Sequence, residues 1–269
     1  MTCRAQMSSL MLALLASTAI STPSFALDPS GTTVDVVPAT AASGSEGNRI
    51  LEVKGPVFMG DEIETNHNGQ AQIEFIDQTR FVVGPNSKVM IDEFVFDASK
   101  TAQEVGISAV KGAFRFITGA SPKQAYSIRT PTMTIGVRGT AFDLAVRTGS
   151  GESMIAIHEG DTSLCDASVP PQCIDAPAGS FIVAPQGGGF DRPDGQARQQ
   201  RLQVFFPLMK ATAKLAPAFK VPSPISIGGG GGGGDPPDNS DGLDNRNPSP
   251  PPSPPSPPPS PPPDGRPPR

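Results

Sequence analysis

Histidine, the residue most often used as a general base, is scarce in this chain. The 269 residues include two histidines, His67 and His158, and a Ser–His–Asp triad would have to use one of them. His67 lies in an Asn-His-Asn-Gly turn, where a solvated loop residue is expected. His158 precedes Glu159-Gly160-Asp161 at the end of an expected strand. Such a group of potential metal ligands is common by chance, so we predict no catalytic residue, no metal site and no cofactor.

Arg138 has an unusual setting, because it stands within the sequence Gly-Val-Arg-Gly at residues 136–139. Glycine in a strand marks a bulge, a positive φ or a close approach of backbone. An arginine in a short apolar strand cannot be buried without partners. We therefore expect Arg138 to hold a tight corner by pairing with several backbone carbonyl oxygens or with a carboxylate, for which Asp61 and Asp143 are the candidates. An Arg138 that contacts a ligand is the alternative.

The first 26 residues have the features of a signal peptide. Arg4 supplies a positive charge, residues 10–20 are apolar, and Ser24–Ala26 fits the small-x-small pattern of a cleavage site. A retained membrane anchor is the alternative, but a span needs about 20 apolar residues. We predict cleavage after Ala26 and a location in the periplasm or outside the cell.

Export makes a disulfide the natural use of the remaining cysteines. Cys3 is removed with the signal peptide, which leaves Cys165 and Cys173, and an even number of cysteines in an oxidising compartment favours pairing. The sequence between them contains two prolines, so we expect a disulfide that closes a loop or a hairpin tip. In the chain-entropy account such a bond stabilises the fold by about 2–3 kcal/mol. The alternative, a Cys-x-x-Cys redox site, needs a different spacing.

Short β-type runs, each closed by a turn signal, fill the chain from residue 49 to residue 190. Residues 70–76 place Ala71, Ile73 and Phe75 on one face, and residues 70–83 resemble a hairpin. The turns recur about every ten residues, which predicts an all-β fold: one compact domain of short strands, arranged as a sandwich, roll or solenoid. The expected strands are residues 49–58, 61–65, 70–76, 79–83, 88–96, 105–110, 112–117, 125–129, 132–137, 141–147, 154–159, 173–175 and 180–183.

The segments around this domain differ in composition. Residues 27–48 are small and polar, and we expect a flexible lead-in. A short helix at 196–206 with a connector should occupy residues 191–221. Residues 222–269 hold seven consecutive glycines and a proline-rich run, which predicts a disordered tail or a polyproline spacer.

Composition also excludes classes of protein. The chain has a formal net charge of −5 and a sequence pI near 5.1, which argues against nucleic acid as the main partner, because phosphate binding needs a basic face. Leucine is rare beyond the first twenty residues, which argues against a helical bundle.

Several motifs together resemble the FecR domain family. They are Gly-Asp-Glu-Ile-Glu-Thr at 60–65, Lys-Gly-Ala-Phe-Arg-Phe-Ile-Thr-Gly at 111–119, Thr-Pro-Thr-Met-Thr-Ile-Gly-Val-Arg-Gly-Thr-Ala-Phe-Asp at 130–143, His-Glu-Gly at 158–160 and Ala-Gly at 178–179. They follow the family's order and cover roughly residues 50–185. The residues that carry the resemblance, for which a structural role is expected, are Gly60, Asp61, Gly112, Arg115, Gly119, Thr130, Pro131, Gly136, Arg138, Gly139, Thr140 and Phe142.

The resemblance implies an extracytoplasmic domain that binds another protein of the cell envelope. FecR-type regulators pass a signal through a membrane helix to a cytoplasmic anti-sigma segment. This sequence is expected to lack both parts, because it begins with a cleavable signal and has no transmembrane stretch. We therefore expect a non-enzymatic interaction or signalling module. The alternative is a structural envelope or surface protein with a polyproline stalk.

Overall fold

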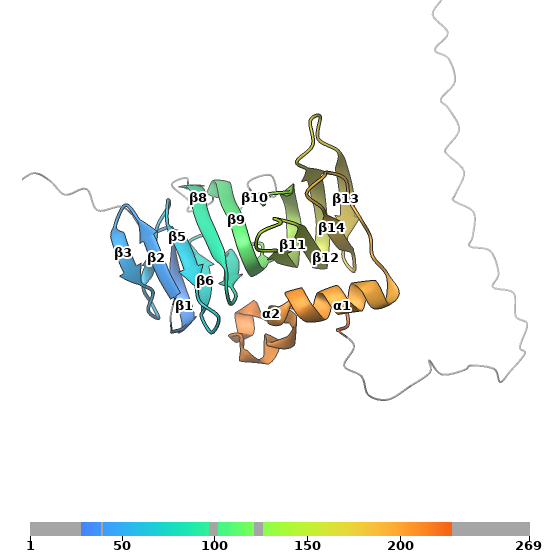
Figure 1. Ribbon diagram of the computed structural model, residues 1–269. Helices are drawn as coiled ribbons and strands as arrows, with labels where there is room; N and C mark the ends of the chain where they lie inside the picture. The colour runs from blue at the N-terminus through green and yellow to red at the C-terminus, as the bar shows by residue number, and fades with distance from the viewer. Residues whose placement is uncertain (1–27, 39, 97–101, 121–125, 228–269) are drawn as a thin grey trace, which may run out of the picture. The chain divides into compact units, whose positions relative to one another are not determined.

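A computed structural model of the protein describes residues 28–38, 40–96, 102–120 and 126–227 (Figure 1). The expected signal peptide and nearly all of the glycine- and proline-rich tail lie outside these residues. Within them the fold is all-β: 14 strands form one continuous sheet, followed by short helices.

The strands between residues 61 and 96 lie close to their expected bounds, and β9, β11 and β12 are longer than expected. The expected strand at 49–58 is instead the end of β3, a turn and the two-residue β4. Their bounds are β1 (Gly31–Val37), β2 (Thr40–Gly44), β3 (Gly47–Ile50), β4 (Pro56–Val57), β5 (Glu62–Thr65), β6 (Gln70–Phe75), β7 (Arg80–Val83), β8 (Lys88–Phe96), β9 (Ala102–Ile117), β10 (Tyr126–Arg129), β11 (Met133–Val146), β12 (Ser153–Asp166), β13 (Cys173–Pro177) and β14 (Phe181–Ala184).

Three long strands pass through a bend that glycine makes possible. Gly112 in β9, Gly139 in β11 and Gly160 in β12 have φ values of 106°, 72° and 71°, a region that residues with a Cβ rarely adopt. The turn signals predict separate strands on either side of Gly112 and of Gly139. Each pair is instead one strand, because a bent strand can keep pairing with its neighbours on both sides of the bend.

The bends divide the strand pairing into two sets. On one side of the bends the order is β3-β2-β5-β8-β9-β10-β11-β12-β13, and on the other it is β4-β1-β6-β7-β9-β11-β12-β14. We call these the first and the second layer. The sheet thus folds over itself as a sandwich whose layers share β9, β11 and β12.

The main hydrophobic core lies between the two layers. Alternate residues of both layers meet in one buried cluster, to which the first layer contributes Ile63, Ile107 and Ile135, and the second Phe81 and Phe142. The expected inward positions Ala71, Ile73 and Phe75 belong to this cluster. The period-two pattern therefore predicted the core-facing side correctly.

Residues 28–48 are not the flexible lead-in expected from their small polar side chains. They form β1, β2 and the start of β3, and β1 pairs with β6 from Gly31↔Phe75 to Val37↔Gln70. Thr33 and Thr40 are buried within these strands. The pairing is with strands that follow along the chain, so local composition gave no sign of it.

Short helices cover the outer face of the second layer. They are α1 (Gly195–Phe205), α2 (Pro207–Lys210), η2 (Thr212–Lys214) and η3 (Pro217–Phe219), and α1 and α2 run beside the strands (Figure 1). Leu202 and Phe206 pack on Met154 and Phe181, and Phe219 packs on Val82 in a separate cluster. We call residues 207–227, which continue from α1 across this face, the C-terminal strap.

Candidate functional site

Three charged or polar side chains lie side by side under the C-terminal strap. Arg115 of β9 donates from Nε to Oδ1 of Asp143 (2.6 Å) and from Nη2 to Oδ2 (2.8 Å). His158 of β12 places Nε2 3.4 Å from Oδ2 of the same carboxylate. The exposed fractions of the three residues are 2%, 1% and 3%, so the cluster is fully buried on the outer face of the second layer.

Asp143 is ionised within this cluster. Burial acts to raise the pKa of Asp143, but the neighbouring Arg115 and His158 side chains lower it more, and its pKa is below the ordinary value. A two-pronged guanidinium–carboxylate pair is the geometry that best offsets the cost of removing both charges from water. The pair thus fixes β9 to β11 at the register Asp143↔Arg115.

The C-terminal strap supplies the remaining partners of the cluster. Nη1 of Arg115 donates to the carbonyl oxygen of Phe219 (3.4 Å), and Nδ1 of His158 lies 2.7 Å from Oγ of Ser223. Further along the same face, the amide of Ala216 donates to Oε1 of Gln72 (2.9 Å). These contacts attach the strap to three strands of the second layer.

Ser223, His158 and Asp143 stand in the order of a hydrolase triad, although nothing in the sequence indicates that Ser223 meets His158. The two outer residues, Asp143 and Ser223, however, make other hydrogen bonds as well. Asp143 is held by two N–H groups of Arg115, and Oγ of Ser223 accepts the amide of Ile225 (3.1 Å). This pattern fits a polar link between strap and sheet, because a triad needs a carboxylate that is free to stabilise the imidazolium.

A second buried carboxylate belongs to Asp61, one of the expected partners of Arg138. Its partner is Arg49, whose Nη1 donates to Oδ1 (2.9 Å) and whose Nη2 also contacts Oδ2. The amide of Phe58 donates to Oδ2 (2.7 Å). Asp61 therefore closes the turn between β4 and β5 rather than holding the Arg138 segment.

The expectation that Arg138 is buried against a carboxylate is wrong. Arg138 is exposed, and the two candidate carboxylates pair with Arg49 and Arg115. The physical reason is alternation along β11: Val137 faces the core, so the next side chain faces solvent. Among the described residues, the arginine that is buried is Arg115, which belongs to the motif at 111–119.

Because Arg138 is exposed, we expect its substitution to change the stability of the fold only slightly. Arg138→Ala should change the free energy of unfolding by no more than about 0.5 kcal/mol, because the side chain buries little. Thermal unfolding of the variant beside the wild type measures this. A loss above about 2 kcal/mol would restore the corner role that the sequence suggested.

The other residues of the expected motifs have structural positions. Gly60 has a φ of 83°, and a Cβ on Gly119 would lie 2.3 Å from the backbone of both Asp77 and Thr79. The remaining motif residues act through turns and packing. Oγ1 of Thr130 accepts a hydrogen bond from the amide of Met133 (3.0 Å), and the hydroxyl of Thr118 donates to the carbonyl oxygen of Thr140 and accepts from its amide. Phe142 stacks on Phe116 at 5.4 Å, Pro131 packs beside Gly151, and Gly136 lies in β11 opposite Ser163.

Comparison with known proteins agrees with these motifs. Residues 61–162 match the family model described as FecR protein. This chain contains a FecR domain. No curated protein matches the sequence.

Solved structures resemble the chain only distantly. Two crystal structures of a proposed anti-sigma factor from Parabacteroides distasonis ATCC 8503 share 14% and 15% sequence identity with it, with TM-scores of 0.40 and 0.39. Each comparison covers 53% of this chain and 64% of the other, so this chain spans less than two thirds of their length.

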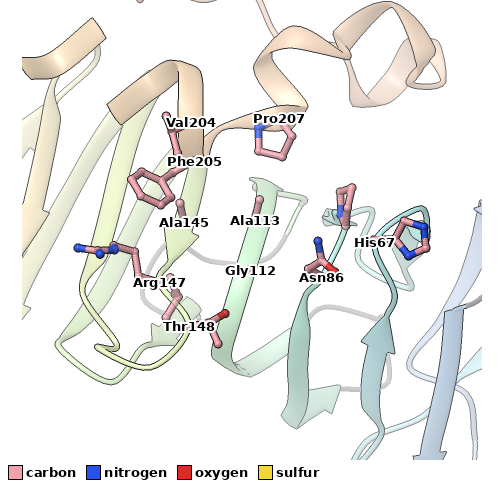
Figure 2. A pocket seen from close by; sticks show the side chains of 12 residues that line it. His67, Asn86, Gly112, Ala113, Ala145, Arg147, Thr148, Val204, Phe205 and Pro207 are labelled. Atoms are coloured by element: carbon pink, nitrogen blue, oxygen red, sulfur yellow. The ribbon is translucent and has the colours of Figure 1, made fainter. Parts of the chain in front are cut away.

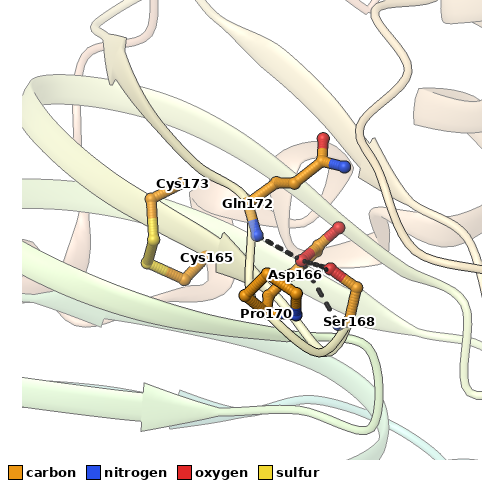
Figure 3. Close-up of a disulfide and its surroundings, with 6 residues drawn as sticks. All are labelled: Cys165, Asp166, Ser168, Pro170, Gln172 and Cys173. Carbon is orange, nitrogen blue, oxygen red and sulfur yellow. Dashed lines mark hydrogen bonds between the residues drawn. A yellow bond between two sulfur atoms is a disulfide. The ribbon is translucent and has the colours of Figure 1, made fainter.

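The expected disulfide lies just beyond the matched part of the FecR domain. Cys165 and Cys173 are bonded and stand opposite each other in β12 and β13 (Figure 3). The bond closes the hairpin tip formed by residues 166–172. This confirms the pairing and the hairpin-tip setting proposed from the sequence.

Asp166 organises the hairpin tip from inside. Its Oδ1 accepts hydrogen bonds from the hydroxyl of Ser168 (2.6 Å) and the amide of Gln172 (2.8 Å) (Figure 3). Its Oδ2 accepts a hydrogen bond from the amide of Gly189. The Ser168 hydroxyl and the amides of Gly189 and Gln172 lower the pKa of Asp166 from 3.8 to about 2. The ionised carboxylate is therefore the form that holds the tip.

A pH titration should show this dependence. Because the pKa of Asp166 is lower in the folded state, its stabilising contact is complete above about pH 4 and is lost as the pH falls through about 2. The amide NMR shifts of Gln172 and Gly189 should titrate together in this window. The step should vanish in Asp166→Asn. Amide shifts that stay constant down to pH 2 would contradict the role given to the carboxylate.

A cavity of about 650 Å³ opens between the end of α1 and a row of strand ends of the FecR domain (Figure 2). Val204, Phe205 and Pro207 form its apolar side, and Asn86 and His67 lie across from them. His67 is exposed and contacts Asn68 (2.9 Å), as expected for a loop residue. The cavity lining combines apolar side chains with the polar side chains of His67, Asn86 and Arg147, a composition that is typical of small-molecule pockets.

The described part of the chain holds neither a group of metal-ligating side chains nor a helix that could span a membrane. Among those residues, no three His, Cys, Asp or Glu side chains are grouped so that they could hold a metal ion. No helix there has the length and apolar character needed to span a membrane.

Proposed function

We propose that this protein is an exported, non-enzymatic module of the bacterial cell envelope that binds another protein and takes part in signalling. The observation that carries the proposal is the FecR domain at residues 61–162. The disulfide supports an oxidising compartment, because such bonds persist outside the cytoplasm. At the N-terminus, the positive charge of Arg4 followed by the apolar residues 10–20 supports export, because this is the pattern of a signal peptide.

The positions of the motif residues support binding rather than catalysis. Arg115, Asp61 and the bend glycines build the fold. We therefore expect a partner to bind to surface residues outside the core and outside these motifs.

A cross-linked pull-down from periplasm tests this proposal. The full chain and a chain that ends at residue 228 are expressed with the same tag, cross-linked in intact cells and purified. An envelope protein recovered with both chains supports an interaction through the domain. Recovery with neither contradicts the proposal. N-terminal sequencing of the same material should start at Leu27 or within two residues of it.

A structural role is the second candidate, and the proline-rich run at 248–263 favours it. Such a run forms an extended spacer, so the domain would be a scaffold on a stalk. Cell fractionation separates the two candidates: soluble periplasmic recovery favours the interaction module, and tight association with the wall or surface favours the scaffold.

A further inference from the structure

The hairpin tip formed by residues 166–172 exposes apolar side chains. Val169 is 97% exposed, the highest value among the large apolar residues described. Ala167, Pro170 and Pro171 beside it are also exposed. These side chains therefore contribute almost nothing to the hydrophobic core.

The same tip is nevertheless held firmly at its base. The Cys165–Cys173 disulfide joins the two strands where the tip begins and ends. Inside it, Asp166 accepts hydrogen bonds from Ser168, Gln172 and Gly189, and the hydroxyl of Ser168 also contacts the carbonyl of Pro170 (2.9 Å). The chain thus fixes the shape of a segment in which Asp166 is buried while the apolar side chains of Ala167, Val169, Pro170 and Pro171 are exposed.

We infer that the hairpin tip is a recognition loop that inserts Val169, between Ala167 and Pro170, into an apolar pocket on an envelope partner protein. This rests on the proposed function and names the surface that performs it. A loop held in its bound shape loses less conformational freedom on binding, which is the known benefit of disulfides and prolines in binding segments. The tip also carries no charged residue from Ala167 to Ile174, so it fits an uncharged pocket.

A protein pocket suits this tip better than a lipid surface. Segments that lie in membrane interfaces use large aromatic or leucine side chains flanked by lysine or arginine. Between Asp166 and Asp175 the chain has no aromatic or basic residue. The side chain of Val169 is small and branched and stands beside two prolines. It can fill a pocket of matching shape on a protein, but it is too short to anchor the tip in a membrane.

Photo-crosslinking from the tip tests the inference in the full chain. A p-benzoylphenylalanine is placed at position 167, beside Val169, and a matched control places it at position 50, where Ile50 of β3 is 67% exposed. In intact cells the probe at 167 should form an adduct with one envelope protein, and the probe at 50 should not. Adding Val169→Asp should reduce that adduct at least about tenfold, because burial of one valine is worth about that factor in affinity.

A synthetic peptide of residues 165–173 tests the role of the fixed shape. The disulfide-closed peptide should compete with the adduct at a concentration at least about tenfold lower than a linear peptide with serine at both cysteine positions. Equal competition by both peptides would overturn the preorganised loop.

The other outcomes separate this inference from the proposed function. An adduct of two copies of this chain, or binding of the tip to phosphatidylglycerol vesicles that Val169→Asp abolishes, would overturn the protein pocket. A partner recovered in the pull-down but never joined to position 167 would overturn the inference and leave the proposed function intact. Absence of any partner in both experiments would overturn both.

Discussion

Arg115→Ala should lower the free energy of unfolding by about 3–5 kcal/mol, because it leaves the carboxylate of Asp143 buried without its partner. Arg115 provides two N–H donors to Asp143 and one to the carbonyl of Phe219. Arg115→Lys should recover only part of this loss, since a single ammonium cannot reproduce the two-pronged contact. Urea unfolding at pH 7 measures each variant.

Two further variants make this prediction specific. The double variant Arg115→Met with Asp143→Leu removes both charges and should regain most of the stability, because a buried ion pair is often no more stabilising than apolar side chains of similar volume. Arg129→Ala is the matched control: Arg129 also faces a carboxylate, that of Asp92 at 3.9 Å, but its side chain is 54% exposed. It should cost less than about 1 kcal/mol. Equal losses at positions 115 and 129 would show that burial of the pair has no special effect.

Gly112→Ala should cost at least about 3 kcal/mol, the second large effect expected in this fold. The residue has a φ of 106°, and a Cβ there would lie 2.1 Å from Oγ and 2.4 Å from Cα of Ser87. Ser87 cannot move aside easily, because its hydroxyl accepts the amide of Ala113 (2.9 Å) and its own amide donates to Thr65 (2.9 Å). The bend of β9 would have to open.

Gly149→Ala separates the two causes of this loss. Gly149 also has a positive φ, 87°, but a Cβ there would meet nothing within 4 Å. The substitution should therefore cost only the backbone strain, about 1 kcal/mol. Urea unfolding of both variants gives the comparison, and a similar loss at the two positions would contradict the close approach at Gly112.

Local alternation explains why much of the fold could be predicted from the sequence. Strand β8 has the predicted bounds, and the 70–83 hairpin pairs Ala71 with Val83. Each of these elements is defined by its own side chains and the turn beside it. The disulfide was predictable for the same reason, because both cysteines and the turn between them lie within a few residues.

The buried polar cluster could not be predicted, because it depends on contacts distant in sequence. The sequence suggests Asp143 only as one of two candidate partners for Arg138, whereas its actual partner Arg115 lies 28 residues away in a neighbouring strand. The contact between His158 and Ser223 spans 65 residues. Neither contact could be predicted, because the polar side chains on the outer face of the second layer indicate exposure to solvent, whereas the C-terminal strap covers them in the structure.

The three bent strands also determine how the domain can come apart. Strands β9, β11 and β12 run without a break through both layers. If one layer lost the hydrogen bonds of these strands, the other layer would lose part of its own pairing as well. The layers should therefore behave as one cooperative unit, with amides on both sides of Gly112, Gly139 and Gly160 exchanging with deuterium through the same global opening. A fragment cut at these bends would carry half-strands without neighbours, so the sandwich cannot be shortened to a single-layer domain.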